Sequence, residues 1–248
     1  MKKISILIIE DEKALLETLK LKLSRENFLV ETAEDGKEGL VKAKKIKPDL
    51  ILLDLVLPSV NGEKILEIIK KDQNLKDIIV IVISNSGQPV EIDRLLTLGA
   101  DDYIIKADFS IDEILERVHN TLEKQKGRPD VLIAEDEMSL RILLSKKIRI
   151  EKLRVITALD GESTLKNILE FKPRVVVLDL LLPGFSGLEV LQALKQEKKF
   201  NKQETKIIIL SNYSGKEDDP LIQEMSQGYF IKSNIDINEA VDAIKKLL

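Results

Sequence analysis

The feature that most constrains this 248-residue chain is a set of polar residues that occurs twice. Each set contains an acidic pair, an isolated aspartate, a serine and a lysine. The first is Glu10, Asp11, Asp54, Ser84 and Lys106, and the second is Glu135, Asp136, Asp179, Ser211 and Lys232. An offset of 125 positions superposes the acidic residues, and it also superposes Pro58, Gly62 and Asp35-Gly36 on Pro183, Gly187 and Asp160-Gly161. A hydrophobic core alone would not require these polar types, so the repeat predicts two copies of one chemically active unit.

The composition is typical of a soluble globular protein with two ordinary domains. Apolar residues make up 44% of the chain and charged residues 33%. The net charge of −4 comes from interspersed signs, so we expect no nucleic-acid partner and no membrane partner. The absence of cysteine excludes disulfides, thiolate metal sites and cysteine nucleophiles. The apolar run Ile4–Ile9 is too short for a signal peptide or a membrane span, and the sequence therefore predicts a cytoplasmic protein.

Short apolar runs alternate with segments of helical period in both halves. The runs of the first half are Ile4–Ile9, Phe28–Val30, Leu50–Leu53, Ile78–Ile83 and Tyr103–Ile105, and those of the second are Val131–Ala134, Arg154–Ile156, Val175–Leu178, Lys206–Leu210 and Tyr229–Ile231. Most are β-branched and nearly continuous, as in parallel strands that are covered on both faces. The pattern predicts the α/β class, with two doubly wound, flavodoxin-like (βα)5 domains. Each should contain a parallel five-stranded sheet in the order 2-1-3-4-5.

The boundary between the two domains is predicted to be short. We expect a first domain over residues 1–124, a linker over 125–129 and a second domain over 130–248, because Gly127 and Pro129 break the helical pattern. Ser110 or Asp112 is available to cap the last helix of the first domain.

Each repeated polar residue follows a predicted strand, and ligands of open α/β sheets bind at the carboxyl edge of the strands. Three carboxylates in one crevice repel one another unless a cation joins them. Oxygen ligands without histidine or cysteine select Mg²⁺, or Mn²⁺, over zinc. Asp54 could then attack a phosphoryl group as a carboxylate nucleophile. Ser84 and Lys106 would stabilise the phosphoryl oxygens.

Ordinary structural roles compete with these interpretations. Asp11 could be a helix N-cap, Ser84 a turn hydroxyl, and Lys106 a solvated surface residue; the same holds for their counterparts in the second half. Asp54 is harder to explain in this way, because it follows a buried run and burial of an unpaired carboxylate is costly. His119, the only histidine, is interpreted as a surface residue flanking the last helix of the first domain.

These residues resemble the receiver domains of two-component response regulators, over essentially the whole chain and twice. The resemblance implies phosphorylation at Asp54, within the segment from Leu53 to Pro58, and at Asp179, within the segment from Leu178 to Pro183. It implies metal ligands at Glu10, Asp11, Asp54 and the Val56 carbonyl, and at Glu135, Asp136, Asp179 and the Leu181 carbonyl. It also implies catalytic roles for Ser84, Lys106, Ser211 and Lys232, and switch roles for Ser84, Tyr103, Ser211 and Tyr229.

The chain departs from this family's pattern at a few positions. Ala107 and Ser233 replace the proline that commonly follows the lysine, and a cis bond at a non-proline residue would be costly. Asn85 and Asn212 stand where a small residue is usual. The acidic segment Glu217-Asp218-Asp219-Pro220 disturbs the expected fourth helix of the second copy.

The leading hypothesis is a tandem receiver without an output domain, which takes phosphoryl groups from a histidine kinase or a histidine phosphotransfer protein. Its output would be a change of conformation that alters binding of a downstream protein. The alternative is a scaffold in which one or both sites are never phosphorylated. Phosphatase or cyclase activity on external substrates is a third class, but beyond self-phosphorylation and slow self-dephosphorylation we expect no enzyme. Dinucleotide, Walker-type and nucleophile-elbow motifs do not fit.

Overall fold

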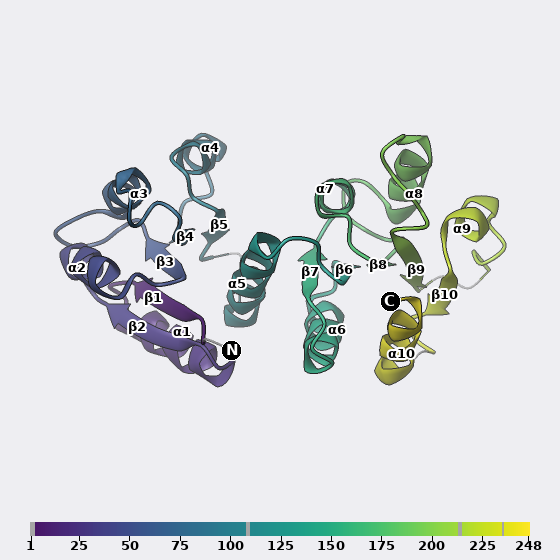
Figure 1. Ribbon diagram of the computed structural model, residues 1–248, viewed down its shortest axis with the longest axis horizontal. Coiled ribbons are helices and arrows are strands. Elements are labelled where there is room, and N and C mark those ends of the chain that lie inside the picture. Colours follow the sequence, from purple (N-terminus) through teal and green to yellow (C-terminus); the bar gives the residue numbers. More distant parts are fainter. Residues whose placement is uncertain (1–2, 108–109, 213–214, 235) are drawn as a thin grey trace. The chain divides into compact units, whose positions relative to one another are not determined.

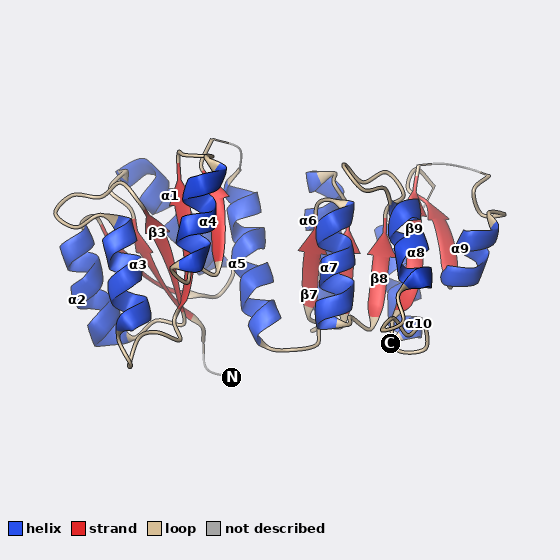
Figure 2. Cartoon of the chain, turned by 90° about the horizontal axis from the view of Figure 1, so that it is seen from above, coloured by secondary structure: helices blue, strands red, loops and turns tan. Residues whose placement is uncertain are grey.

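The computed structural model describes residues 3–107, 110–212, 215–234 and 236–248. It contains two five-stranded parallel sheets, one in each half of the chain (Figure 1). Their strand orders are β2-β1-β3-β4-β5 and β7-β6-β8-β9-β10. Each sheet therefore has the predicted 2-1-3-4-5 order, and helices alternate with strands along both halves (Figure 2).

The elements of the first half are β1 (Ser5–Ile9), α1 (Lys13–Arg25), β2 (Leu29–Ala33), α2 (Gly36–Ile46), β3 (Leu50–Asp54), α3 (Gly62–Lys71), β4 (Ile79–Ser84), α4 (Pro89–Thr97), β5 (Asp102–Ile105) and α5 (Ile111–Gln125). Those of the second half are β6 (Val131–Ala134), α6 (Met138–Ile150), β7 (Val155–Ala158), α7 (Gly161–Phe171), β8 (Val175–Leu178), α8 (Gly187–Gln196), β9 (Lys206–Ser211), α9 (Pro220–Met225), β10 (Gly228–Ile231) and α10 (Ile237–Leu247).

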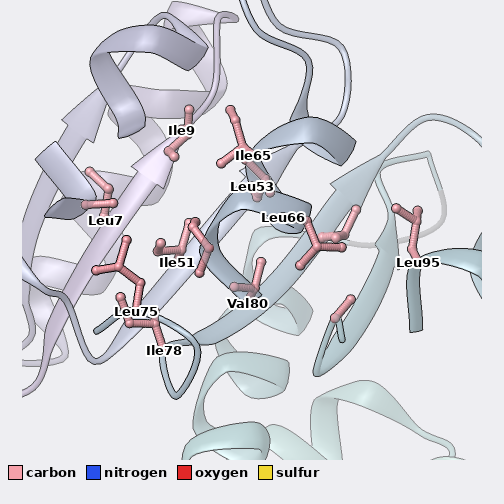
Figure 3. Packing of buried hydrophobic residues seen from close by; sticks show 14 of the residues in the cluster. Leu7, Ile9, Ile51, Leu53, Ile65, Leu66, Leu75, Ile78, Val80 and Leu95 are labelled. Atoms are coloured by element: carbon pink, nitrogen blue, oxygen red, sulfur yellow. The ribbon is translucent and has the colours of Figure 1, made fainter. Parts of the chain in front are cut away.

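Each sheet is covered on both faces, which explains why its central strands are continuously apolar. In the first half, one face of the sheet packs against α2, α3 and α4, and Figure 3 shows Leu53 of β3 close to Ile65 and Leu66 of α3. In the second half, α7, α8 and α9 cover one face while α6 and α10 cover the other (Figure 1). Burial of alternate side chains against opposite layers is the main stabilising contribution to such a sheet.

The chain divides into two compact units, Met1–Thr121 and Leu122–Leu248. Helix α5 ends at Gln125, and β6 begins at Val131. Gly127, between them, has a φ of +86°, a backbone conformation that glycine adopts without strain. The boundaries 1–124, 125–129 and 130–248 remain predictions.

One strand and two helices differ from the simplest expectation. Edge strand β2 runs to Ala33, beyond the predicted apolar run, and its residues Leu29 and Glu31 are exposed. Leu96, although in the apolar stripe of α4, is also exposed. Helix α9 has only six residues, against nine in α4, and Asp219 caps it by accepting from the Leu221 amide. The acidic segment therefore does shorten the fourth helix of the second copy.

The repeated aspartates before α2 and α7 have a structural role. Asp35 accepts hydrogen bonds from the Lys37 and Glu38 amides, and Asp160 accepts one from the Ser163 amide. These contacts satisfy backbone donors at the start of each helix. Part of the 125-position repeat therefore reflects helix capping.

The glycines that begin α3 and α8 are required by close backbone approach. A Cβ on Gly62 would lie 2.0 Å from the Asp54 carbonyl oxygen, and a Cβ on Gly187 would lie 2.1 Å from that of Asp179. Both distances are far below van der Waals contact. The two glycines therefore allow the loop after each isolated aspartate to fold back tightly.

Candidate functional site

The carboxyl ends of β1, β3, β4 and β5 bring the predicted residues of the first copy together. Ile9 pairs with Leu53 across β1 and β3, so Glu10 and Asp54 lie side by side just beyond the pair. The Lys106 amide donates to the Ser84 carbonyl oxygen at 2.7 Å. One oxygen from each of Glu10, Asp11 and Asp54 lies within 4.8 Å of the other two.

Lys106 holds two of these carboxylates. Its Nζ lies 2.8 Å from Asp54 Oδ2 and 2.8 Å from Glu10 Oε2. The Lys106 side chain is only 11% exposed, so water screens these ion pairs weakly. The other Asp54 oxygen, Oδ1, accepts from the Val56 amide at 3.2 Å.

The second copy repeats this geometry. Lys232 Nζ lies 2.7 Å from Asp179 Oδ2 and 2.7 Å from Glu135 Oε1. Asp179 Oδ1 accepts from the Leu181 amide at 3.0 Å. Oxygens of Glu135, Asp136 and Asp179 again lie within 4.8 Å of one another. The three carboxylates of each predicted acidic site therefore lie together in both copies.

The buried glutamates are hard to ionise. Burial, together with the negative charge of Asp54, raises the pKa of Glu10 from 4.5 to about 7 against the opposing effect of Lys106. Burial likewise raises the pKa of Glu135 to about 6. The pKa of Lys106 and that of Lys232 are both raised, because hydrogen bonds to the carboxylates outweigh desolvation. Each lysine therefore stays positively charged beside the carboxylates of its cluster.

The donor set fits a hard divalent cation. Each cluster offers three carboxylates and no nitrogen or sulfur ligand, which favours Mg²⁺ or Mn²⁺. In the second copy, Glu135 Oε2 is buried and has no hydrogen-bond partner among the residues that the structure describes. An oxygen of this kind is costly unless a further ligand satisfies it. Asp11 and Asp136 are exposed and leave each cluster open to solvent.

The serines and tyrosines of the sites also come together. Ser84 and Ser211 are buried, and a hydrogen bond between Ser84 and Tyr103 offsets part of the rise that burial produces in the pKa of Tyr103. The Tyr103 hydroxyl also donates to the Ser86 carbonyl oxygen at 2.6 Å. Ser211 and Tyr229 are hydrogen-bonded in the same way.

Several of the ordinary alternatives can be decided from this geometry. The N-cap residues of α1 and α6 are Glu12 and Glu137, so Asp11 and Asp136 are not helix caps. The two site lysines are not surface residues. Ser84 does have a turn role, because its Oγ accepts from the Ser86 amide at 3.2 Å.

The interpretation of His119 as a surface residue was wrong. Its side chain is 17% exposed, lies 3.6 Å from Glu26 and packs on Phe28 with ring centroids 5.2 Å apart. Ser110 is confirmed as the cap of α5, since its Oγ accepts from the Glu113 amide.

The departures after the lysines leave the backbone in an ordinary conformation. Peptide bonds of the described residues are all trans, those before Ala107 and Ser233 included. Asn85 and Asn212 are exposed.

Two contributors near the sites were not predicted. Ser86 donates from its Oγ to Glu91 of α4 at 2.6 Å. Arg141 of α6 is 1% exposed, and its Nη1 donates to the carbonyl oxygens of Glu135 and Asp136 at 3.0 and 2.9 Å. The sequence does contain a sign that Arg141 is buried. It occupies the position of the helix at which the first copy has the apolar residue Leu16, on the stripe that faces the core.

Comparison with known proteins identifies the family. The response regulator receiver domain matches residues 6–119 and again residues 131–245. The chain therefore belongs to the response regulator receiver domain family and contains two receiver domains in tandem.

Curated relatives match one receiver domain of the chain. Over 120 residues the chain is 44% identical to the response regulator ArlR of Staphylococcus aureus strain Mu50. This matched segment makes up 48% of the chain and 53% of ArlR. The chain spans about half the length of the curated relatives it matches.

Two solved structures of similar proteins each cover about half of the chain. TrrA of Thermotoga maritima in complex with Mg(2+)-BeF is 33% identical, with a TM-score of 0.42, and covers 48% of this chain and 97% of its own. A CheY-like receiver domain protein from Methanospirillum hungatei is 30% identical, with a TM-score of 0.47. The match covers 50% of this chain and 98% of that protein's chain. Within the described residues, no helix is both long and apolar enough to span a membrane.

Proposed function

We propose that Asp54 and Asp179 each accept a phosphoryl group in a magnesium-dependent reaction. The observation that carries this proposal is the duplicated cluster of three carboxylates, two of which contact one lysine, with lysine-to-aspartate distances of 2.8 and 2.7 Å. Membership of the receiver family supports a histidine kinase or a histidine phosphotransfer protein as the donor.

In the proposed reaction a carboxylate oxygen of Asp54 attacks the phosphorus of a phosphohistidine. A phosphorus–oxygen bond forms, the phosphorus–nitrogen bond breaks, and the leaving imidazole takes up a proton. Glu10, Asp11, Asp54 and the Val56 carbonyl would hold Mg²⁺ in the first copy, and Glu135, Asp136, Asp179 and the Leu181 carbonyl in the second. The bound metal ion would supply charge neutralisation at the phosphoryl oxygens.

The chain's own residues would orient and stabilise the product. Lys106, already at hydrogen-bond distance from Asp54, provides a fixed positive charge for a phosphoryl oxygen. The Ser84 hydroxyl would donate to a second oxygen in place of its hydrogen bond with Tyr103. Tyr103 is hydrogen-bonded to Ser84 and to the Ser86 carbonyl oxygen, and Ser86 contacts Glu91 of α4. A movement of Tyr103 would therefore affect α4. Lys232, Ser211 and Tyr229 would have the same roles in the second copy.

Intact-mass spectrometry after treatment with acetyl phosphate and Mg²⁺ tests the proposal. We expect the wild-type chain to gain up to two phosphoryl groups, and Asp54→Asn or Asp179→Asn to gain no more than one. Asp77→Asn is a matched control, because Asp77 is an exposed aspartate in the loop before β4. The double Asp54→Asn, Asp179→Asn variant should gain none.

A scaffold with silent sites remains the second candidate function. It would give no mass gain in the wild-type chain with any phosphodonor, including a cognate kinase. A gain that persists in the double variant would also overturn the proposal, because the phosphoryl group would then lie elsewhere.

A further inference from the structure

The loop that follows the isolated aspartate is anchored by the same three backbone amides in both copies. In the first copy the amides of Val56, Gly62 and Gly36 donate to Asp54 Oδ1 and to the carbonyl oxygens of Leu55 and Pro58, at 3.2, 2.9 and 3.3 Å. The corresponding distances in the second copy are 3.0, 3.1 and 3.5 Å. Because these anchors match, a difference in side chains between the two loops is informative.

A serine side chain ties the first loop to helix α2. Ser59 Oγ donates to Oδ2 of Asp35, the N-cap of α2, whose other oxygen accepts from the amides at the start of the helix. Ser59 has a φ of +62°, which is unfavourable for a residue with a Cβ. The Val60 amide donates to the Pro58 carbonyl oxygen at 2.7 Å and closes a tight turn around Ser59. The contact with Asp35 therefore offsets part of the strain of this turn.

The second copy uses the corresponding aspartate differently. In place of Ser59 it has Gly184, which has a φ of +70° and no side chain that could donate. Asp160 is the counterpart of Asp35, and its Oδ2 lies 2.9 Å from Oγ of Ser163 in the first turn of the same helix. The carboxylate oxygen that holds the loop in the first copy is therefore satisfied within its own helix in the second.

We infer that Ser59 is a positioning residue of the first site, whose hydrogen bond to Asp35 holds the loop that carries Val56 in the conformation that binds a divalent cation. This inference rests on the proposed function, in which the Val56 carbonyl oxygen is a metal ligand. A loop that is already ordered loses less conformational entropy when the ion binds. A single exposed hydrogen bond of this kind should change the cation affinity of its own site about two- to fivefold.

The amides of Val56 and Leu181 report on the two sites, because each donates to the aspartate of its own copy. A titration with MgCl₂ followed by amide NMR, at a pH above the pKa of both glutamates, gives one midpoint for each site. Variants are compared within one site, since charged neighbours differ between the copies, as Lys13 and Met138 do.

Two substitutions of Ser59 test the hydroxyl. Ser59→Gly removes it and relieves the strain of the turn, whereas Ser59→Ala removes it and retains the Cβ. We expect both to raise the Val56 midpoint about two- to fivefold, and the Leu181 midpoint to stay unchanged as the internal control. An unchanged Val56 midpoint, or a rise in Ser59→Gly alone, would overturn the inference, because the latter would reflect only a more flexible backbone.

The second site allows the same contact to be built in. Gly184→Ser combined with Ser163→Ala supplies a loop hydroxyl and frees Oδ2 of Asp160, and there is open space around Gly184 for a Cβ. The matched control is Gly184→Ala with Ser163→Ala, which carries the same strain without the hydroxyl. We expect the Leu181 midpoint to be about two- to fivefold lower in the serine variant than in this control. Equal midpoints would contradict the role of the hydroxyl.

The outcomes separate this inference from the proposed function and from a purely structural role. If neither amide of the wild-type chain responds to Mg²⁺, the proposed function fails, and the inference fails with it. If both respond but the Ser59 variants leave the Val56 midpoint unchanged, only the role of Ser59 is wrong. Backbone relaxation that shows a looser Val60 amide without a shifted Val56 midpoint would assign Ser59 to the fold of the loop alone.

Discussion

At the scale of single residues, each site is a balance between carboxylate repulsion and one lysine. Glu10 and Asp54 are almost fully buried, and Lys106 contacts both. Buried ion pairs of this kind add little net stability when complete, but they are costly when one member is removed. The lysine is therefore needed for the site to exist before any metal or phosphoryl group binds.

Replacing Lys106 by alanine should destabilise the metal-free chain by about 3–5 kcal/mol, because two buried carboxylates lose their shared cation. Urea unfolding in the presence of a chelator measures this. Lys71→Ala is the matched control, since Lys71 pairs with Glu67 while 74% exposed; its effect should stay within about 0.5 kcal/mol. Similar effects of the two substitutions would show that the buried pair is not structurally important.

The raised glutamate pKa values predict how stability changes with pH. Folding raises the pKa of Glu10 from 4.5 to about 7, so between these values the folded chain binds more protons than the unfolded chain. The free energy of unfolding without Mg²⁺ should therefore fall as pH rises through this window. Glu135 acts in the same direction up to a pH of about 6.

Urea unfolding of the chelator-treated chain at several pH values measures this dependence. Glu10→Gln mimics the protonated state and should flatten the profile most between pH 6 and 7, because the raised pKa of Glu10 lies above that of Glu135. An unchanged slope in that variant would contradict the assignment. Added Mg²⁺ should stabilise the wild-type chain more strongly as the glutamates ionise.

At the scale of elements, the loop after each phosphoaccepting aspartate depends on a glycine at the start of the next helix. In Gly187→Ala the new Cβ would meet the Asp179 carbonyl oxygen. We expect a loss of roughly 1–3 kcal/mol, together with less phosphorylation of Asp179. Gly228→Ala is the control, because its Cβ would meet only the Phe230 ring at 3.3 Å. Mass spectrometry that locates the modified residue should find phosphorylation of Asp54 unchanged in both variants.

Helix α4 is tied to the first site through Ser86. Its Oγ donates to Glu91 in the first turn of α4, and its carbonyl oxygen accepts from Tyr103. Ser86→Ala should cost about 1 kcal/mol locally and speed amide exchange in the first turn of α4. Thr97→Ala, which removes a hydroxyl contact at the far end of the same helix, should leave that first turn protected. Equal exchange in the two variants would rule out Ser86 as the link.

Sequence patterns predicted the sheet order and the members of both acidic clusters, because apolar runs locate the strands and parallel strands share one carboxyl edge. They could not predict contacts that depend on how helices pack. Arg141 has the residue type of a surface position, yet α6 buries it. His119 is half-buried because α5 lies against Phe28, a contact between segments distant in sequence.

At the scale of the whole molecule, each acidic cluster is built entirely within one unit of the chain. The two sites should therefore accept phosphoryl groups independently. Blocking Asp54 by substitution with asparagine should leave Mg²⁺-dependent modification of Asp179 in place, and the reverse should also hold. Loss of both modifications in either single variant would instead indicate transfer between the sites.

The most direct test of the central claim is chemical identification of the modified residues. Borohydride reduces an aspartyl phosphate to homoserine, which peptide sequencing by mass spectrometry locates. After treatment with a phosphodonor and Mg²⁺, homoserine should appear at positions 54 and 179, and a chelator should abolish both. Homoserine at other aspartates, or at neither position under any donor, would contradict a receiver with two magnesium-dependent phosphorylation sites.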